Sequence, residues 1–231
     1  MLVVIPEVVS SDIYRFGFIE PNVARSIIKF VSKNDVVIDV GAHFGFFTIL
    51  MAELVGSKGK VHSFEPIPST FNVLKKNTDS FQNIQINREA IWRFNDQLYL
   101  NDYGLNDSAF NSYRDSRGIN KGKINKVKVK AINLDEYIKI KKINPKFIKI
   151  DAESTEFEVL EGMDFTLKNI KPVICLEIGD LGVKGAKKSR NVIEHLLNYG
   201  YEVFEFNNES LYPHKLKDKY NYGNLLFKHP N

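Results

Sequence analysis

The chain has 231 residues, which is enough for one large domain or two small ones. Its residues are 43% hydrophobic and 26% charged, a composition that excludes disordered, collagen-like and coiled-coil proteins. The formal charge of +4 is too small to require a polyanionic partner. We interpret residues 1–231 as a single domain.

The start of the chain and its single cysteine predict where the protein works. Met1–Ile5 lacks the basic start of a signal peptide and stops at Pro6, so no leader is expected. No stretch reaches the roughly 18 apolar residues that a membrane-spanning helix needs. Cys175 cannot form an internal disulfide, and a cytoplasmic location is the simplest expectation.

Short runs rich in valine and isoleucine alternate with stretches of helical period, which predicts an α/β fold with a mostly parallel sheet. Residues 1–34 are expected to form a strand and a covering helix that starts at Pro21. Residues 35–95 form the cofactor-binding half of the sheet. Its predicted strands are Val36–Val40, Lys60–Glu65 and Ile84–Ala90, and its predicted helices are Phe46–Val55 and Ser69–Asn77.

The pattern changes over residues 96–133, which we expect to form a small β insertion. Three runs alternate there as antiparallel strands do, around Gly104, Gly118 and Gly122: Gln97–Asp102, Ser108–Tyr113 and Lys126–Ile132. Residues 134–231 resume the sheet. Their predicted strands are Phe147–Asp151, Val173–Ile178, Tyr201–Phe206 and Leu225–Lys228, and their predicted helices are Leu134–Ile140, Phe157–Gly162 and Asn191–Tyr199.

A glycine-containing turn follows the first buried strand. The end of a strand, a turn and the start of a helix are predicted in the run Asp39-Val40-Gly41-Ala42-His43-Phe44-Gly45-Phe46-Phe47-Thr48. This arrangement is typical of sites that bind nucleotide-like ligands. His43 and Phe46 stand where a dinucleotide fingerprint needs glycines, and Val61 follows Gly59-Lys60 where a Walker motif needs Ser or Thr. By itself the turn is also compatible with a plain strand-to-helix connection.

Two acids narrow the choice of ligand. Glu65, which precedes Pro66, ends the next predicted strand. Its carboxylate can accept hydrogen bonds from both hydroxyls of a ribose. Asp39 precedes the first glycine and can orient the turn and hold an ammonium group. A ligand with a ribose, an ammonium and a sulfonium is S-adenosylmethionine. We therefore predict this cofactor, bound by Asp39, Glu65, Pro66 and the turn residues Gly41, Ala42, His43, Gly45, Phe46 and Thr48.

These segments resemble the FkbM family of S-adenosylmethionine-dependent methyltransferases. The resemblance spans roughly Phe18 to Ile178 and rests on residues 35–45, Phe64-Glu65-Pro66-Ile67-Pro68, Leu134-Asp135 and Ile148-Lys149-Ile150-Asp151-Ala152-Glu153. It implies a class I methyltransferase (Rossmann-like) fold, seven strands with an antiparallel last one. It also implies O-methylation of a hydroxyl on a sugar, a glycan or a secondary metabolite.

The resemblance also marks a polar segment and two departures. Asn106-Asp107-Ser108 matches a polar segment that the family tends to carry, so a contact with cofactor or acceptor is expected, although an Asx turn explains the segment equally well. His43 replaces the family's usual Asn, and Glu153-Ser154-Thr155-Glu156 replaces Glu-Gly-x-Glu. Serine in place of glycine is expected to restrict the backbone to ordinary dihedral angles. This second change leaves a non-catalytic cofactor-binding module as an alternative.

Ligands of open parallel sheets lie outside the carboxyl ends of the strands, so several side chains should converge at one edge. These are Asp39, Glu65, Ala90, Asp151 and Glu177, with Ala90 beside the adenine. Asp151, which also neighbours the cofactor, is our first candidate for the general base, followed by Glu153 and Glu156. His43 could serve as a base or only bind the cofactor, and Glu156 could simply start a helix. Asp151, Glu153 and Glu177 could hold a divalent ion, but no metal is predicted.

Positive charge is concentrated in residues 114–149, which carry a local charge of +9. Lysines mostly alternate there, at Lys121, Lys123, Lys126, Lys128 and Lys130, as on one face of a strand. This face is either solvated or attracts an anionic acceptor, a small molecule or a glycan. Aromatic residues are scarce between Gly118 and Lys130, which argues against nucleic acid as a partner. An RNA methyltransferase remains the alternative enzyme.

Overall fold

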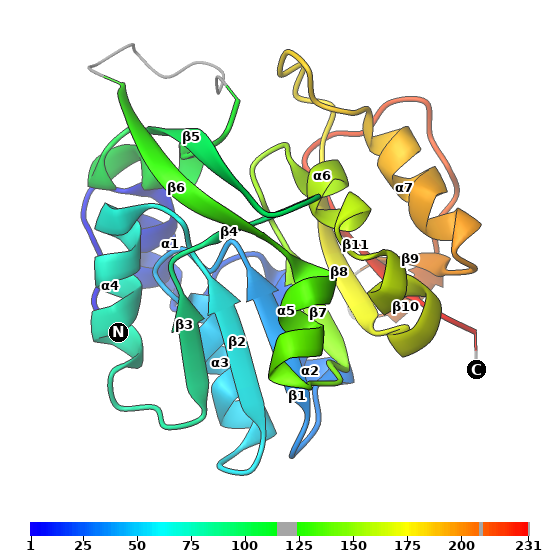
Figure 1. The fold of residues 1–231 in the computed structure, drawn as a ribbon, viewed down its shortest axis with the longest axis horizontal. Coiled ribbons are helices and arrows are strands. Elements are labelled where there is room, and N and C mark those ends of the chain that lie inside the picture. Colours follow the sequence, from blue (N-terminus) through cyan, green and yellow to red (C-terminus); the bar gives the residue numbers. More distant parts are fainter. Residues whose placement is uncertain (115–123, 208–209, 231) are drawn as a thin grey trace.

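The computed structural model describes residues 1–114, 124–207 and 210–230 (Figure 1). Gly118, Lys121, Gly122 and Lys123 lie outside the described residues. Within them, the main sheet has eight strands in the order β10-β9-β11-β8-β7-β1-β2-β3. The strands are β1 (Val36–Val40), β2 (Lys60–Phe64), β3 (Ile84–Asn87), β7 (Phe147–Ile150), β8 (Val173–Ile178), β9 (Glu202–Asn207), β10 (Ser210–Pro213) and β11 (Gly223–Lys228).

Strand direction follows the predicted scheme. β3, β2, β1, β7 and β8 run parallel, and β11 inserts between β8 and β9 antiparallel to both. This arrangement confirms a mostly parallel sheet closed by an antiparallel strand. β10 adds a further antiparallel edge strand, which the sequence did not predict because its four residues are largely exposed and show no apolar alternation.

Helices cover both faces of the main sheet because successive strand residues point to opposite sides. Val37 and Phe147 pack with α2 (Pro21–Phe30) and α3 (Phe46–Val55) on one face. Ile38 and Ile148 face the other side. That side is covered by α5 (Leu134–Lys141), α6 (Glu156–Glu161) and α7 (Ser189–Asn198) (Figure 1). α4 (Pro68–Thr78) connects β2 to β3, and a π-helix (Thr166–Ile170) precedes β8. No helix in the described ranges has the length and hydrophobicity to cross a bilayer.

Residues 1–34, all of them described, form two helices and no strand, so the predicted N-terminal strand is wrong. α1 (Val8–Phe16) begins after Glu7, whose buried carboxylate accepts hydrogen bonds from the backbone N–H groups of Val9 and Ser10. This side-chain cap starts α1 at Val8, just after the strand-like run Met1–Ile5, which forms no strand. The helix predicted at Pro21 is confirmed as α2.

The insertion forms a second, smaller sheet from β4 (Ala90–Trp92), β5 (Asp96–Asp102) and β6 (Asn125–Asn133), in the order β4-β6-β5. β5 and β6 pair antiparallel as predicted. The prediction of a single strand over Ile84–Ala90 is wrong, because the chain leaves the main sheet after β3 and joins the small sheet as β4.

The strand predicted at Ser108–Tyr113 is also wrong. Residues Leu105–Phe110 form a 3-10 helix, η1, and only an isolated bridge joins Ser112 to Asn101 within the described residues. The Asp102 carboxylate accepts a hydrogen bond from the Gly104 N–H, and Gly104 has φ +84°. This Asx turn reverses the chain and overrides the alternating pattern.

Candidate functional site

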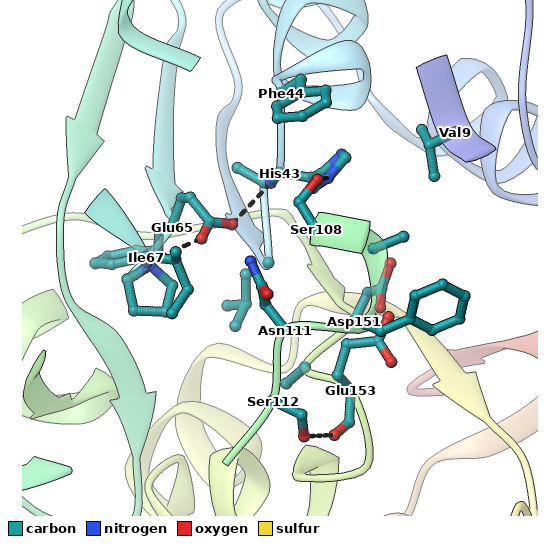
Figure 2. Close-up of a pocket in the computed structure, with 18 of the residues that line it drawn as sticks. Val9, His43, Phe44, Glu65, Ile67, Ser108, Asn111, Ser112, Asp151 and Glu153 are labelled. Atoms are coloured by element: carbon teal, nitrogen blue, oxygen red, sulfur yellow. Dashed lines mark hydrogen bonds between the residues drawn. The ribbon is translucent and has the colours of Figure 1, made fainter. Parts of the chain in front are cut away.

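A cavity of about 440 Å³ opens at the carboxyl ends of β1, β2 and β7 (Figure 2). Most of the predicted site residues line it: Gly41, Ala42, His43, Phe46, Glu65, Pro66, Ala90, Ser108, Asp151 and Glu153. Asp39, Gly45, Thr48 and Asp107 do not belong to this lining, although Asp39 and Thr48 are fully buried behind it. The expected convergence of strand ends on one edge is therefore present.

The turn after β1 has a backbone that few residues could adopt. Gly41 has φ +75°, and a Cβ at this position would overlap the carbonyl oxygen of Asp151. His43 has φ +50°, in the left-handed region where Asn, Asp and His are the most frequent residues other than glycine. The exchange of Asn for His therefore keeps the shape of the turn.

Glu65 connects the turn to the next strand. Its carboxylate accepts hydrogen bonds from the backbone N–H groups of His43, at 3.1 Å, and Ile67, at 3.0 Å (Figure 2). Burial raises the pKa of Glu65 to about 8, despite these two hydrogen bonds. Ile67, Ala90 and Ile91 supply an apolar wall of the cavity beside it. A carboxylate next to an apolar wall suits a ribose attached to an adenine.

A buried cation lies between the turn and the end of β7. Lys149 pairs in register with Asp39 across β1 and β7, so both side chains lie on the same face of the sheet. The Lys149 ammonium is 3.6 Å from Asp39 Oδ1 and 3.1 Å from Asp151 Oδ2. Burial alone would lower the pKa of Lys149, but Asp151 and Asp39 raise it above its ordinary value. Thr48 Oγ1 donates to Asp39 Oδ2 at 2.6 Å.

Sequence reasoning did not assign Lys149 a role, since an isolated lysine near a strand end is usually solvated. The available signal was its position between Ile148 and Ile150 in a strand with no other polar residue. A lysine in a fully buried strand needs an acidic partner. Asp39 is the matching acid on the neighbouring strand.

Three carboxylates gather at the other end of the cavity. One oxygen from each of Asp151, Glu153 and Glu177 lies within 4.8 Å of the other two. Burial, followed by the nearby Asp151, raises the pKa of Glu153 and of Glu177 well above the usual range. Such a set can share protons or supply the oxygen ligands of a hard divalent cation.

The loop before α6 holds two residues in left-handed conformation, Glu153 at φ +50° and Ser154 at φ +71°. The expectation of ordinary dihedral angles at Ser154 is therefore wrong. The Glu156 carboxylate accepts hydrogen bonds from the N–H groups of Ala152 and Ser154, and Ser112 Oγ donates to the Glu153 carbonyl (Figure 2). These bonds offset the backbone strain and give Glu156 a structural role at the start of α6.

Two residues that the sequence did not indicate complete this end of the cavity. Glu20, just before α2, and Tyr222, just before β11, both line it. The Tyr222 hydroxyl lies 3.5 Å from Glu20 Oε1, and Asn224 Nδ2 donates to Glu20 Oε2 at 3.2 Å. Burial and then Asp151 raise the pKa of Glu20. About two hundred residues separate these partners, so no local pattern could have joined them.

His43 and Ser108 bring the insertion to the turn. His43 Nε2 lies 2.8 Å from Ser108 Oγ (Figure 2). Burial lowers the pKa of His43 to about 4, so the imidazole is neutral at pH 7. A neutral imidazole can accept a hydrogen bond at one nitrogen and donate one at the other.

The described lysines of the basic insertion point away from the cavity. Lys126, Lys128 and Lys130 are exposed and alternate along β6, as predicted. Val129, on the opposite face of β6, packs against Leu98 and Leu100, which line the cavity. These three lysines are therefore not positioned to bind an anion inside the cavity.

The strand order and the turn after β1 define a class I methyltransferase fold. A family model described as the methyltransferase FkbM domain matches residues 39–203. The chain belongs to this family of methyltransferases, which confirms the family and fold expected from the sequence.

Individual relatives agree with this assignment. The hexuronic acid methyltransferase AglP of Haloferax volcanii is 28% identical over 162 residues, which are 67% of this chain and 61% of AglP. The chain thus spans about three fifths of that relative. The FkbM methyltransferase of Methylobacillus flagellatus has a TM-score of 0.53 at 12% identity, over 89% of this chain and 50% of its own. Aeropyrum pernix fibrillarin, solved with natively bound S-adenosylmethionine, has a TM-score of 0.53 at 12% identity. The match covers 89% of this chain and 73% of the fibrillarin chain.

Proposed function

We propose that this chain transfers the methyl group of S-adenosylmethionine to a hydroxyl oxygen of a sugar, either free or within a glycan. The observation that carries the proposal is the arrangement of Glu65 and Asp151 on one cavity, at the ends of β2 and β7, the parallel strands on either side of β1. Family membership supports methyl transfer, and the name of the relative AglP supports a sugar as acceptor.

The residues present fit this cofactor. In its ionised form Glu65 would accept hydrogen bonds from the ribose hydroxyls, because each of its oxygens then has one backbone donor and a second lone pair. Ile67, Ala90 and Ile91 would cover the adenine. Asp39 and Asp151 share one buried cation, Lys149, so an ammonium near Asp151 would complete the local charge balance. When bound, S-adenosylmethionine supplies an electrophilic methyl group.

The acceptor hydroxyl would lie at the carboxylate end of the cavity. We expect Asp151 to take the hydroxyl proton, a contribution of roughly 10²- to 10⁴-fold in rate. Lys149 holds Asp151 in place by an ion pair at 3.1 Å. Glu153 also lines the cavity, with Glu177 beside it, and could form hydrogen bonds with other hydroxyls of the acceptor. Apolar residues of α1, such as Val9 and Ile13, would exclude water.

The test combines cofactor binding with label transfer. Calorimetry should show binding of S-adenosylmethionine and of its demethylated product, and Glu65→Ala should abolish that binding while the thermal unfolding midpoint remains measurable. Incubation with cofactor carrying a labelled methyl group should transfer label to sugar or glycan fractions of a cell extract. No binding at millimolar cofactor would refute the proposal. Label in RNA, or binding without any labelled product, would favour the RNA methyltransferase or the non-catalytic module instead.

A further inference from the structure

A second cavity of about 280 Å³ adjoins the acceptor end of the first. Leu181 lines both cavities, and Ser154 of the second cavity follows Glu153 of the first. The walls of the second cavity come from residues 179–188, which follow β8, and from residues 218–219, which precede β11. A bound molecule could therefore extend from one cavity into the other.

The walls of the second cavity are held together by Asp180. Its carboxylate accepts hydrogen bonds from the backbone N–H groups of Ser189 and Tyr220, both at 2.8 Å. These bonds outweigh the effect of burial and lower the pKa of Asp180. Both carboxylate oxygens are thus engaged in joining the start of α7 to the segment before β11.

The second cavity has positive charge available, whereas the first does not. Lys187 and Lys188 line one wall and Lys219 lines the other. All three are exposed, and none forms an ion pair with another described residue. The remaining acid of the lining, Asp218, pairs with Arg190 at 2.6 Å.

In the first cavity, by contrast, the ammonium of Lys149 is already paired with Asp39 and Asp151. Glu20 and Glu153 add further acidic groups to the same lining. An anionic substituent would therefore be repelled by the first cavity and attracted by the second.

We propose that the second cavity binds the anionic group, a carboxylate or a phosphate, of the sugar whose hydroxyl is methylated in the first. This inference rests on the proposed function and assigns the attraction for anions to Lys187, Lys188 and Lys219. Both a uronic acid and a sugar phosphate carry the required charge, and the two can be told apart by direct comparison.

The experiment titrates the full chain, saturated with the demethylated cofactor product, with glucuronate, glucose 6-phosphate and glucose. Binding is followed by calorimetry and by NMR shifts of labelled lysine side chains. We expect both anionic sugars to bind more tightly than glucose, with a preference that weakens as salt is raised. The tighter of the two anionic sugars identifies the group as carboxylate or phosphate. The double variant Lys188→Ala/Lys219→Ala should bind the anionic sugars about fivefold more weakly.

The matched control is Lys128→Ala, which removes an equally exposed lysine from the outer face of β6 and should leave all three affinities unchanged. Affinity for the demethylated cofactor product should be the same in every variant. Equal binding of glucose and the anionic sugars, no anion-dependent shift at millimolar concentrations, or an unaltered double variant would each overturn the inference. Loss of cofactor-product binding in the unmodified chain would instead refute the proposed function.

Discussion

The two ends of the main cavity are constructed differently. At the end that we propose binds the cofactor, the cofactor end, residues 39–67 supply the turn and Glu65, and the carboxylate is held by two backbone N–H groups. At the end that we propose binds the acceptor, the acceptor end, Glu20, Asp151, Glu177 and Tyr222 come from four segments far apart in the chain. The first end depends on local hydrogen bonds, whereas the second depends on how strands and connecting segments pack.

This difference has a chemical consequence. The backbone donors around Glu65 are fixed by the turn, so the cofactor end is preorganised before any ligand binds. The acceptor end concentrates carboxylates around one buried cation, Lys149. Its geometry therefore depends on charge balance, and substitutions there should affect turnover and stability more than cofactor affinity.

The sharpest separation of the two ends should come from Asp151→Asn. Loss of the proton acceptor should reduce kcat by roughly 10²- to 10⁴-fold. Calorimetry with the demethylated product should show a much smaller loss of affinity, because only the charge beside the ammonium of the cofactor is removed while Glu65 and the turn are unaltered. If affinity and turnover fell together, the division of the cavity into two functional ends would be wrong.

Removal of the central cation should destabilise the whole edge of the sheet. Lys149→Met leaves Asp39 and Asp151 without their buried partner, and we expect the free energy of unfolding to fall by about 3–5 kcal/mol. Urea denaturation measures this loss. Lys128→Met, an exposed lysine of β6, should change stability by less than about 0.5 kcal/mol. A second substitution, Asp39→Asn, should recover part of the stability, and no recovery would argue against the ion pair.

The cofactor end should also give stability a pH dependence. Because the pKa of Glu65 is raised from 4.5 to about 8, the folded state keeps its proton to higher pH than the unfolded state. The free energy of unfolding of the cofactor-free protein should therefore fall between about pH 5 and 8, by at most roughly 1.4 kcal/mol per pH unit from this group.

Denaturation at several pH values, with Glu65→Gln as comparison, isolates this contribution from that of the acceptor-end acids. The variant should show a flatter decline over the same range. Parallel pH profiles for the two proteins would contradict the assignment of this proton to Glu65.

The smallest expected effects come from two serines that contact opposite ends. Ser108→Ala removes the hydrogen bond to His43 and should weaken cofactor binding by about fivefold. Ser112→Ala removes the bond to the Glu153 carbonyl and should raise the acceptor KM instead. Calorimetry and steady-state kinetics distinguish the two results. The same response from both variants would show that the ends are coupled.

The cofactor end could be predicted largely from the sequence because its parts are adjacent. A buried strand, a turn with Gly41 and Gly45, a helix and a second strand ending at Glu65 follow one another directly. Each step uses local rules of period, turn geometry and strand polarity. For the same reason the parallel strands and most of their helices were predicted. Three elements were not predicted, because other interactions override a weak sequence pattern. A side-chain cap starts α1, an Asx turn precedes η1, and pairing with β9 forms the edge strand β10.

By itself, then, the sequence determined the family, the fold class and the ranges of most parallel strands, and it predicted which residues form the cofactor end of the cavity. Only the tertiary structure decided that Lys149 lies between Asp39 and Asp151, and that Glu20 and Tyr222 meet across the cavity. It also decided that the described lysines of β6 face outward and that Lys187, Lys188 and Lys219 border a neighbouring cavity. The physical reason is that pKa shifts and ion pairs depend on distances between segments far apart in the chain, which no local pattern contains.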